Sequence, residues 1–140
     1  MADGFIQQRP NVGEPGSQRT EARVVYDGDA VYVAIRAHDT APDSIAAQLG
    51  RRDASGLISD YVQVTLDGYH DRRTAFRFAV SPRGVKRDAF HYDDTSEDPT
   101  WDGVWQAETT IDSAGWSAEF RIPFSQLRYR RSADEQTWGI

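Results

Sequence analysis

Apolar and polar residues alternate along four stretches of this 140-residue chain, with a repeat of two residues. Successive side chains of a β-strand point to opposite faces of the sheet, so this alternation is typical of strands that are buried on one side. The pattern therefore predicts four half-buried strands. Their apolar positions are Val31, Val33, Ile35 and Ala37; Val62, Val64 and Leu66; Phe76, Phe78 and Val80; and Trp116, Ala118, Phe120 and Ile122.

The residues between these stretches favour tight turns. Asp27-Gly28 is a strong hairpin signal and predicts antiparallel pairing of strands over residues 19–26 and 29–38. Asp67-Gly68 and segments 81–84 and 112–115 also have the composition of turns. Helix is expected only as short turns, one of them after Pro123. We therefore predict an all-β fold, an antiparallel β-sandwich of the immunoglobulin or jelly-roll kind.

The length fits one domain, because single domains most often have roughly 100 to 150 residues. Residues 1–18 are rich in Gly, Pro and Gln without a sustained period, so we expect an irregular leader followed by a sandwich domain over residues 19–140. Residues 136–140 begin an apolar strand for which the sequence offers no partner. We expect the natural domain to extend beyond this segment at both ends.

Charge and motifs exclude several classes of function. The net charge is −6, from 22 acidic and 16 basic residues, which disfavours nucleic acid as a partner. The chain has no cysteine, and no apolar run approaches the ~18 residues of a membrane span. Nucleophile-elbow, zinc-protease and phosphate-loop motifs are missing, and the three histidines lie far apart. We therefore predict a protein that is not an enzyme.

Several strings of the sequence carry a family resemblance. They are Val24-Val25-Tyr26-Asp27, Ser59-Asp60-Tyr61-Val62, Ala75-Phe76-Arg77-Phe78 and Gly115-Trp116-Ser117-Ala118-Glu119, together with Arg51-Arg52-Asp53, Trp101-Asp102-Gly103-Val104-Trp105 and Leu127-Arg128-Tyr129. By the first four strings the chain resembles family 9 carbohydrate-binding modules. By the last three it resembles, more narrowly, the variant found ahead of a β-barrel domain of unknown function in bacterial envelope proteins.

The resemblance implies non-catalytic binding of a polysaccharide or oligosaccharide. It also implies attachment to a larger cell-envelope protein, with a periplasmic, cell-surface or secreted location. Sugar-binding members of the family clamp the sugar between two tryptophans, but Leu57 and Ile58 stand where the first is carried, and Gln63 replaces the usual acid. These departures favour an alternative, a structural or protein-interaction domain that has lost sugar binding.

Four residues are candidates for carbohydrate contact. Trp101 and Trp105 flank a glycine in a polar loop, and an aromatic face suits the apolar side of a pyranose ring. Arg77 and Gln63 project opposite the apolar residues of their strands and offer planar polar groups to hydroxyls. Two alternatives stay open. Trp105 falls on the same alternate positions as the inward-facing residues of a strand and is equally explained as a core residue. The polar face of the strands is equally explained as an ordinary solvated surface.

Acidic residues crowd the segment 93–102. The family uses structural calcium, so this segment is the candidate for a metal, although its spacing fits no EF-hand and the identity of any metal is unknown. We expect no other cofactor. Asp94 and Glu97 also support a weaker alternative, a glycan hydrolase, which requires two carboxyl groups at a defined separation.

Overall fold

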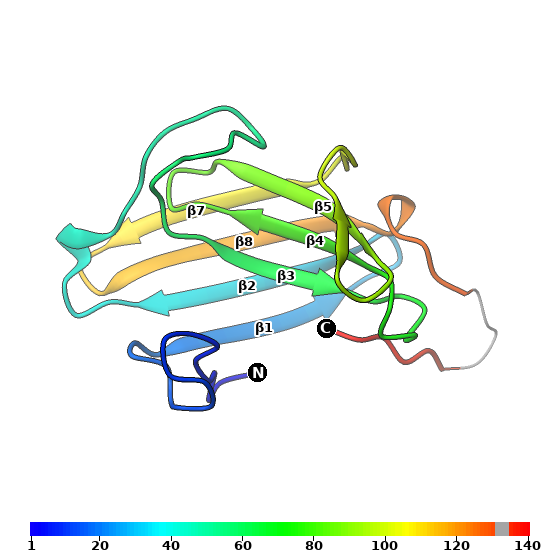
Figure 1. Ribbon diagram of the computed structural model, residues 1–140, viewed down its shortest axis with the longest axis horizontal. Coiled ribbons are helices and arrows are strands. Elements are labelled where there is room, and N and C mark those ends of the chain that lie inside the picture. Colours follow the sequence, from blue (N-terminus) through cyan, green and yellow to red (C-terminus); the bar gives the residue numbers. More distant parts are fainter. Residues whose placement is uncertain (131–134) are drawn as a thin grey trace.

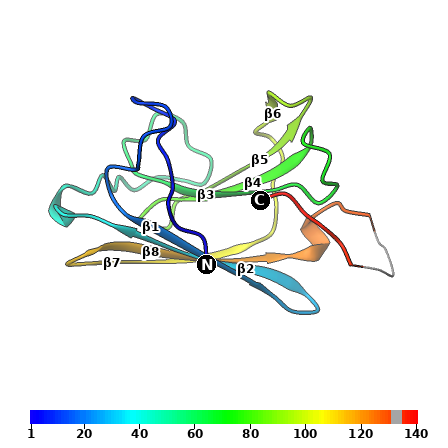
Figure 2. The ribbon, with the colours of Figure 1, turned by 90° about the horizontal axis from the view of Figure 1, so that it is seen from below.

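The computed structural model has two antiparallel sheets, described for residues 1–130 and 135–140 (Figure 1). Their strand orders are β1-β2-β8-β7 and β3-β4-β5-β6. The sheets face each other as two layers, which confirms the predicted β-sandwich (Figure 2). The strands are β1 (Thr20–Tyr26), β2 (Ala30–His38), β3 (Val62–Leu66), β4 (Ala75–Val80), β5 (Lys86–Tyr92), β6 (Ser96–Asp98), β7 (Gln106–Asp112) and β8 (Gly115–Pro123).

The predicted opening hairpin is present. β1 and β2 pair from Thr20 opposite Ala37 to Tyr26 opposite Val31. The carboxylate of Asp27 accepts hydrogen bonds from the backbone N–H groups of Asp29 and Ala30, at 2.8 and 2.9 Å, and this fixes the turn.

The apolar positions named from the alternation fill the space between the sheets. Trp116 is 4% exposed, and Ala118, Phe120 and Ile122 lie beside it on the inner face of β8. Their strand therefore has the predicted orientation. The largest members of the core are Val31, Val33, Ile35, Val64, Leu66, Phe76, Phe78, Val80, Trp105, Trp116, Phe120, Ile122 and Leu127.

Four strands fall outside the four alternating stretches that were used for the prediction: β1, which the hairpin signal predicted, β7, which has the parity noted for Trp105, and β5 and β6. β5 forms the middle of the second sheet between β4 and β6, and β6 lies inside the acidic segment that we expected to be a loop. β6 forms because its backbone pairs with the end of β5, from Phe90 opposite Asp98 to Tyr92 opposite Ser96. The acidic side chains thus stand at a sheet edge.

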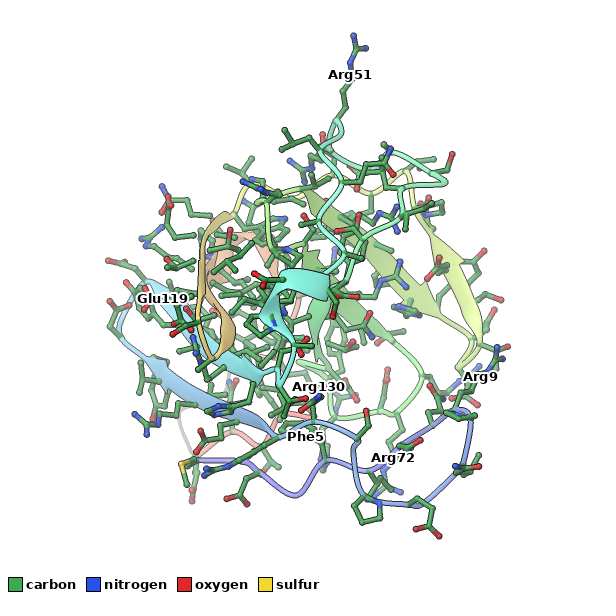
Figure 3. The ribbon with its side chains drawn as sticks, turned by 90° about the vertical axis from the view of Figure 1, so that its left-hand side faces the viewer. Phe5, Arg9, Arg51, Arg72, Glu119 and Arg130 are labelled. Atoms are coloured by element: carbon green, nitrogen blue, oxygen red, sulfur yellow. The ribbon has the colours of Figure 1, made fainter. Side chains whose placement is uncertain are left out.

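Irregular segments near both termini pair with the edge strand β1 and with the residue that follows the edge strand β3. In the segment 1–18, Ala2 pairs with Ala22 of β1, and near the C-terminus Gly139 exchanges backbone hydrogen bonds of 2.9 and 3.0 Å with Asp67. The expectation that residues 136–140 lack a partner is therefore wrong, since the partner lies in a loop distant in sequence. In the long β2–β3 connection Arg51 projects away from the body (Figure 3).

Short helical turns are the only helices of the described residues. They are η1 (Pro42–Ser44) and η2 (Phe124–Gln126), and η2 is the turn predicted after Pro123. Neither is long and apolar enough to cross a membrane.

Candidate functional site

The outer face of the second sheet brings together two of the candidate residues. Gln63 lies on β3 opposite Ala79 of β4. Arg77 lies on β4 opposite Thr65, which is the next residue of β3 that faces the same side as Gln63. Both side chains point away from the core because their neighbours Val64 and Phe78 point into it.

Arg77 lies flat across the neighbouring strand. Its Nη1 is 2.9 Å from the Oε2 of Glu97 on β6, so the side chain passes over β5, where its cross-strand neighbour is Ala89. Ala89 is 0% exposed although it faces outward, because the arginine covers it. The Nε of Arg77 is buried and has no hydrogen-bond partner among the described residues. One donor of the guanidinium thus remains unsatisfied.

Arg87 crosses the sheet in the opposite direction. From β5 it passes over Ala79, which is 5% exposed, and its guanidinium lies 4.4 Å from the ring centre of Tyr61. The Nη2 of Arg87 donates a 2.5 Å hydrogen bond to the carbonyl of Ala54. Two small residues, Ala89 and Ala79, therefore leave room for two arginine side chains to extend across the sheet.

This outer polar face is defined by Tyr61, Gln63, Thr65, Arg77, Arg87, His91 and Glu97. Guanidinium and amide groups are planar and donate several hydrogen bonds, which suits the hydroxyl groups of a sugar. The Nε2 of His91 lies 3.6 Å from the Oε2 of Glu97 and places an imidazole nitrogen near that carboxylate, in addition to the guanidinium of Arg77. The outer polar face thus presents donors and acceptors with little protrusion.

Trp105 lies in the core rather than on the surface. It is 2% exposed and stacks on Phe120 with ring centres 5.7 Å apart and planes inclined by 8°. The Nζ of Lys86 lies 5.0 Å from the centre of the same ring. Because its surroundings cover it, Trp105 has no free face for a sugar, and the core alternative holds for this residue.

Trp101 is half-buried and packs on the same core. Its ring centre lies 4.8 Å from that of Phe76 and 5.7 Å from that of Phe78. Gly103 makes this possible, since a Cβ there would lie 2.6 Å from the edge of the Trp101 ring. The structure therefore places neither Trp101 nor Trp105 beside Arg77 and Gln63 on the outer polar face.

Four of the five carboxylates of the acidic segment have a protein partner, and Asp94 is the exception among the contacts of the described residues. Asp93 pairs with Arg73 at 3.2 Å, and Glu97 pairs with Arg77. The hydroxyl and the backbone N–H of Thr100 donate to Asp98 and hold the pKa of this carboxyl below its usual value. These contacts compete with any metal for the same oxygens.

A different group of carboxylates surrounds Arg52, and it is named here the Arg52 cluster. The Nη2 of Arg52 lies 2.6 Å from both oxygens of Asp88, 2.5 Å from Asp102 and 2.7 Å from the carbonyl of Gly103, while its Nε is 3.2 Å from Asp53. Burial lowers the pKa of Arg52, but the hydrogen bond and charge of Asp88 outweigh it, so the pKa lies above its usual value.

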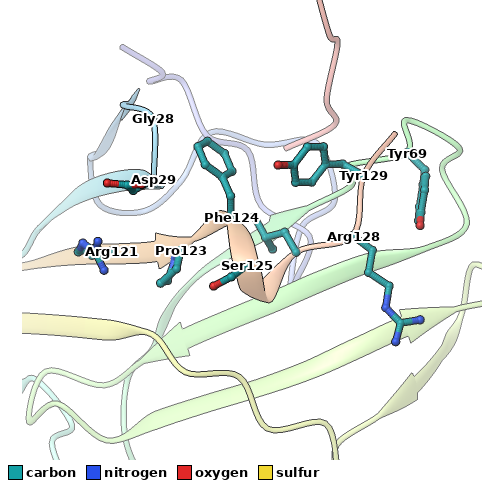
Figure 4. A pocket seen from close by; sticks show the side chains of 10 residues that line it. Gly28, Asp29, Tyr69, Arg121, Pro123, Phe124, Ser125, Arg128 and Tyr129 are labelled. Atoms are coloured by element: carbon teal, nitrogen blue, oxygen red, sulfur yellow. The ribbon is translucent and has the colours of Figure 1, made fainter. Parts of the chain in front are cut away.

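A groove of about 670 Å³ lies at one end of the sandwich, beside η2 (Figure 4). Arg121, Arg128, Tyr69 and Tyr129 are among its lining residues, and they come from β8, from the segment after η2 and from the β3–β4 loop. Sequence patterns did not single out this groove because the three segments meet only in the folded chain.

Comparison with solved structures places the fold beside family 9 carbohydrate-binding modules. Such a module from Caldicellulosiruptor kristjanssonii, in complex with glucose, is 17% identical, with 86% of this chain and 57% of that chain covered and a TM-score of 0.53. One in complex with cellotriose is 17% identical, with 88% and 62% covered and a TM-score of 0.53. The chain thus spans about three fifths of their length. The sequence matches no protein-family model and no curated protein.

Proposed function

We propose that this chain is a non-catalytic carbohydrate-binding module and that the outer polar face is its contact surface. The observation that carries the proposal is the flat arrangement of Arg77 and Arg87 over Ala89 and Ala79, with Gln63 beside them. Support comes from the fold, since the similar modules are in complex with glucose and cellotriose.

The mode of contact differs from an aromatic clamp. The exposed donors of the outer polar face are guanidinium and amide groups, and the ring of Tyr61 is covered by Arg87. Hydrogen bonds to solvated hydroxyls contribute only about 0.5 to 1.5 kcal/mol each, because both partners give up water. We therefore expect a modest affinity for a poly- or oligosaccharide that lies flat on the sheet.

Binding without catalysis is part of the proposal. The hydrolase alternative requires Asp94 and Glu97 to act as acid and base, but the carboxylate of Glu97 pairs with Arg77 and His91. The proposal also includes attachment to a larger cell-envelope protein and a periplasmic, cell-surface or secreted location, as the resemblance of the sequence implies.

Calorimetric titration of the domain with cellotriose and with a panel of soluble glycans measures the binding affinity and tests the proposal. Arg77→Ala should weaken binding at least about tenfold, because a hydrogen bond from a charged donor contributes ~1.5 to 3 kcal/mol. Arg23→Ala is the matched control, since it removes the same charge from an exposed position on β1 of the other sheet. Equal affinity of Arg77→Ala and the wild type would contradict the proposed surface.

A second candidate function, a protein-interaction domain, is favoured by one observation. A groove of about 550 Å³ between β1 and the C-terminal segment is lined mainly by apolar residues, among which Tyr26 is 79% and Val24 46% exposed. Exposed apolar patches mark association surfaces. Sedimentation at increasing concentration tests this candidate: association in the wild type that Tyr26→Ser removes would favour it, and monomers throughout would count against self-association.

A further inference from the structure

Three carboxylates converge in the Arg52 cluster. One oxygen from each of Asp53, Asp88 and Asp102 lies within 4.8 Å of the other two. Like charges at this separation repel each other, so the group requires a cation. Calcium prefers six to eight oxygen ligands. The three carboxylates and the carbonyl of Gly103 offer four oxygen-bearing groups.

Arg52 already contacts each of these four groups. Its Nη2 donates to Asp88 and to the carbonyl of Gly103, and it also pairs with Asp102. A guanidinium carries five N–H donors in one plane and stays charged at every physiological pH. A calcium ion therefore meets a positive charge within bonding distance of the ligands that it would need, so these residues do not fit calcium as they stand.

The cluster connects parts of the chain that are distant in sequence. Asp88 lies on β5 and is 2% exposed, whereas Asp53 belongs to the β2–β3 connection and Asp102 to the β6–β7 connection. Backbone contacts tighten the group: the N–H of Gly103 donates to Asp88 at 2.6 Å, and the N–H of Asp88 donates to Asp53 at 3.1 Å. The two connections are thus held against β5.

We propose that Arg52 is the built-in cation of a three-carboxylate site and acts there in place of a bound calcium ion. Two consequences follow. The folded domain does not require calcium at this site, and removal of the guanidinium uncovers a site for a divalent cation formed by Asp53, Asp88, Asp102 and the Gly103 carbonyl. The cluster also fixes the segment that carries Ala54, whose carbonyl holds Arg87 on the outer polar face.

Thermal melting in EDTA and in about 5 mM CaCl2, with NaCl adjusted to equal ionic strength, tests the proposal. The wild type should melt at the same temperature in both buffers. Arg52→Ala should melt roughly 10 °C lower in EDTA, because it leaves a buried carboxylate unpaired, and calcium should restore several degrees. Arg51→Ala is the matched control, since Arg51 projects into solvent (Figure 3), and it should behave as the wild type.

The double variant Arg52→Ala/Asp88→Asn keeps the test decisive if Arg52→Ala fails to fold. It removes the unpaired buried charge together with its partner, so it should fold and melt at the same temperature with and without calcium. Recovery of folded Arg52→Ala only in calcium would support the proposal. A calcium-dependent rise in the wild type, an Arg52→Ala melt equal to that of Arg51→Ala, or no response of folded Arg52→Ala to calcium would each overturn it.

Discussion

Trp101 and Trp105 both pack against Phe78, and this contact decides what the two residues do. An indole that fills the space between the sheets stabilises the fold by burying apolar area, at about 25 cal/mol per Å². It does not serve as a platform for a ligand. At the scale of single residues, the polar side chains of the outer face are therefore better binding candidates than the aromatic ones.

Substitution of Trp116 and Trp101 separates packing from binding. Trp116→Ala should lower the free energy of unfolding by about 3 to 5 kcal/mol, and Trp101→Ala by about half as much because its ring is only half-buried. Urea unfolding of both variants checks this. If Trp101→Ala left stability unchanged and abolished glycan binding, Trp101 would be a ligand contact and its packing on Phe76 would be unimportant.

Whole strands connect through side chains that cross their neighbours. Arg36 of β2 reaches across β8 to Asp112 of β7, with two contacts of 2.6 and 2.7 Å. These hydrogen bonds from Arg36, aided by the backbone N–H of Ala114, lower the pKa of Asp112 to about 2. The pair therefore ties three strands of the first sheet together while Asp112 is ionised.

The pKa of Asp112 gives a pH dependence with a definite sign. A carboxyl whose pKa is lower in the folded chain stabilises the fold above its ordinary pKa of 3.8, and this contribution is lost as the pH falls toward about 2. When the pH falls from 3.8 to about 2, the free energy of unfolding of Asp112→Asn should therefore decrease less than that of the wild type, as measured by urea unfolding. Asp3→Asn, at an exposed N-terminal position, is the control, and an equal loss in all three proteins would contradict the pair.

The turn between β7 and β8 depends on a glycine. Gly115 has a φ of +129°, and a Cβ there would lie 2.1 Å from the carbonyl oxygen of Ala37. Gly115→Ala should therefore destabilise the fold by about 3 kcal/mol. Gly28→Ala in the β1–β2 turn, where a Cβ meets no atom within 4 Å, should be nearly neutral. Similar melting temperatures for the two variants would contradict this account of the turn.

Strands with regular alternation were predictable, whereas β5 was not. Its inward-facing positions include Lys86 and Asp88, which hide the apolar alternation, and their charges are compensated by groups elsewhere in the chain: the Trp105 carbonyl and Arg52. The sequence placed Arg77 and Gln63 on outward faces correctly. It gave no signal for the crossing of Arg77 to Glu97, because that contact spans three strands.

At the scale of the molecule, the second sheet has two different faces. Its inner face is apolar and packs on the first sheet, and its outer face carries two arginine side chains that extend across neighbouring strands. The β2–β3 connection, fixed by the Arg52 cluster, holds Arg87 on that outer face. Fold and candidate binding surface are thus coupled through contacts that single-strand patterns do not contain.

Amide chemical-shift mapping of the isotope-labelled domain during titration with cellotriose tests the central claim most directly. The proposed function predicts saturable shifts concentrated at Gln63, Thr65, Arg77, Ala79 and Ala89 on the second sheet, with β1, β2, β7 and β8 unchanged. Shifts centred on the groove beside η2, or no shifts with any glycan of the panel, would contradict the outer polar face as a carbohydrate-binding surface.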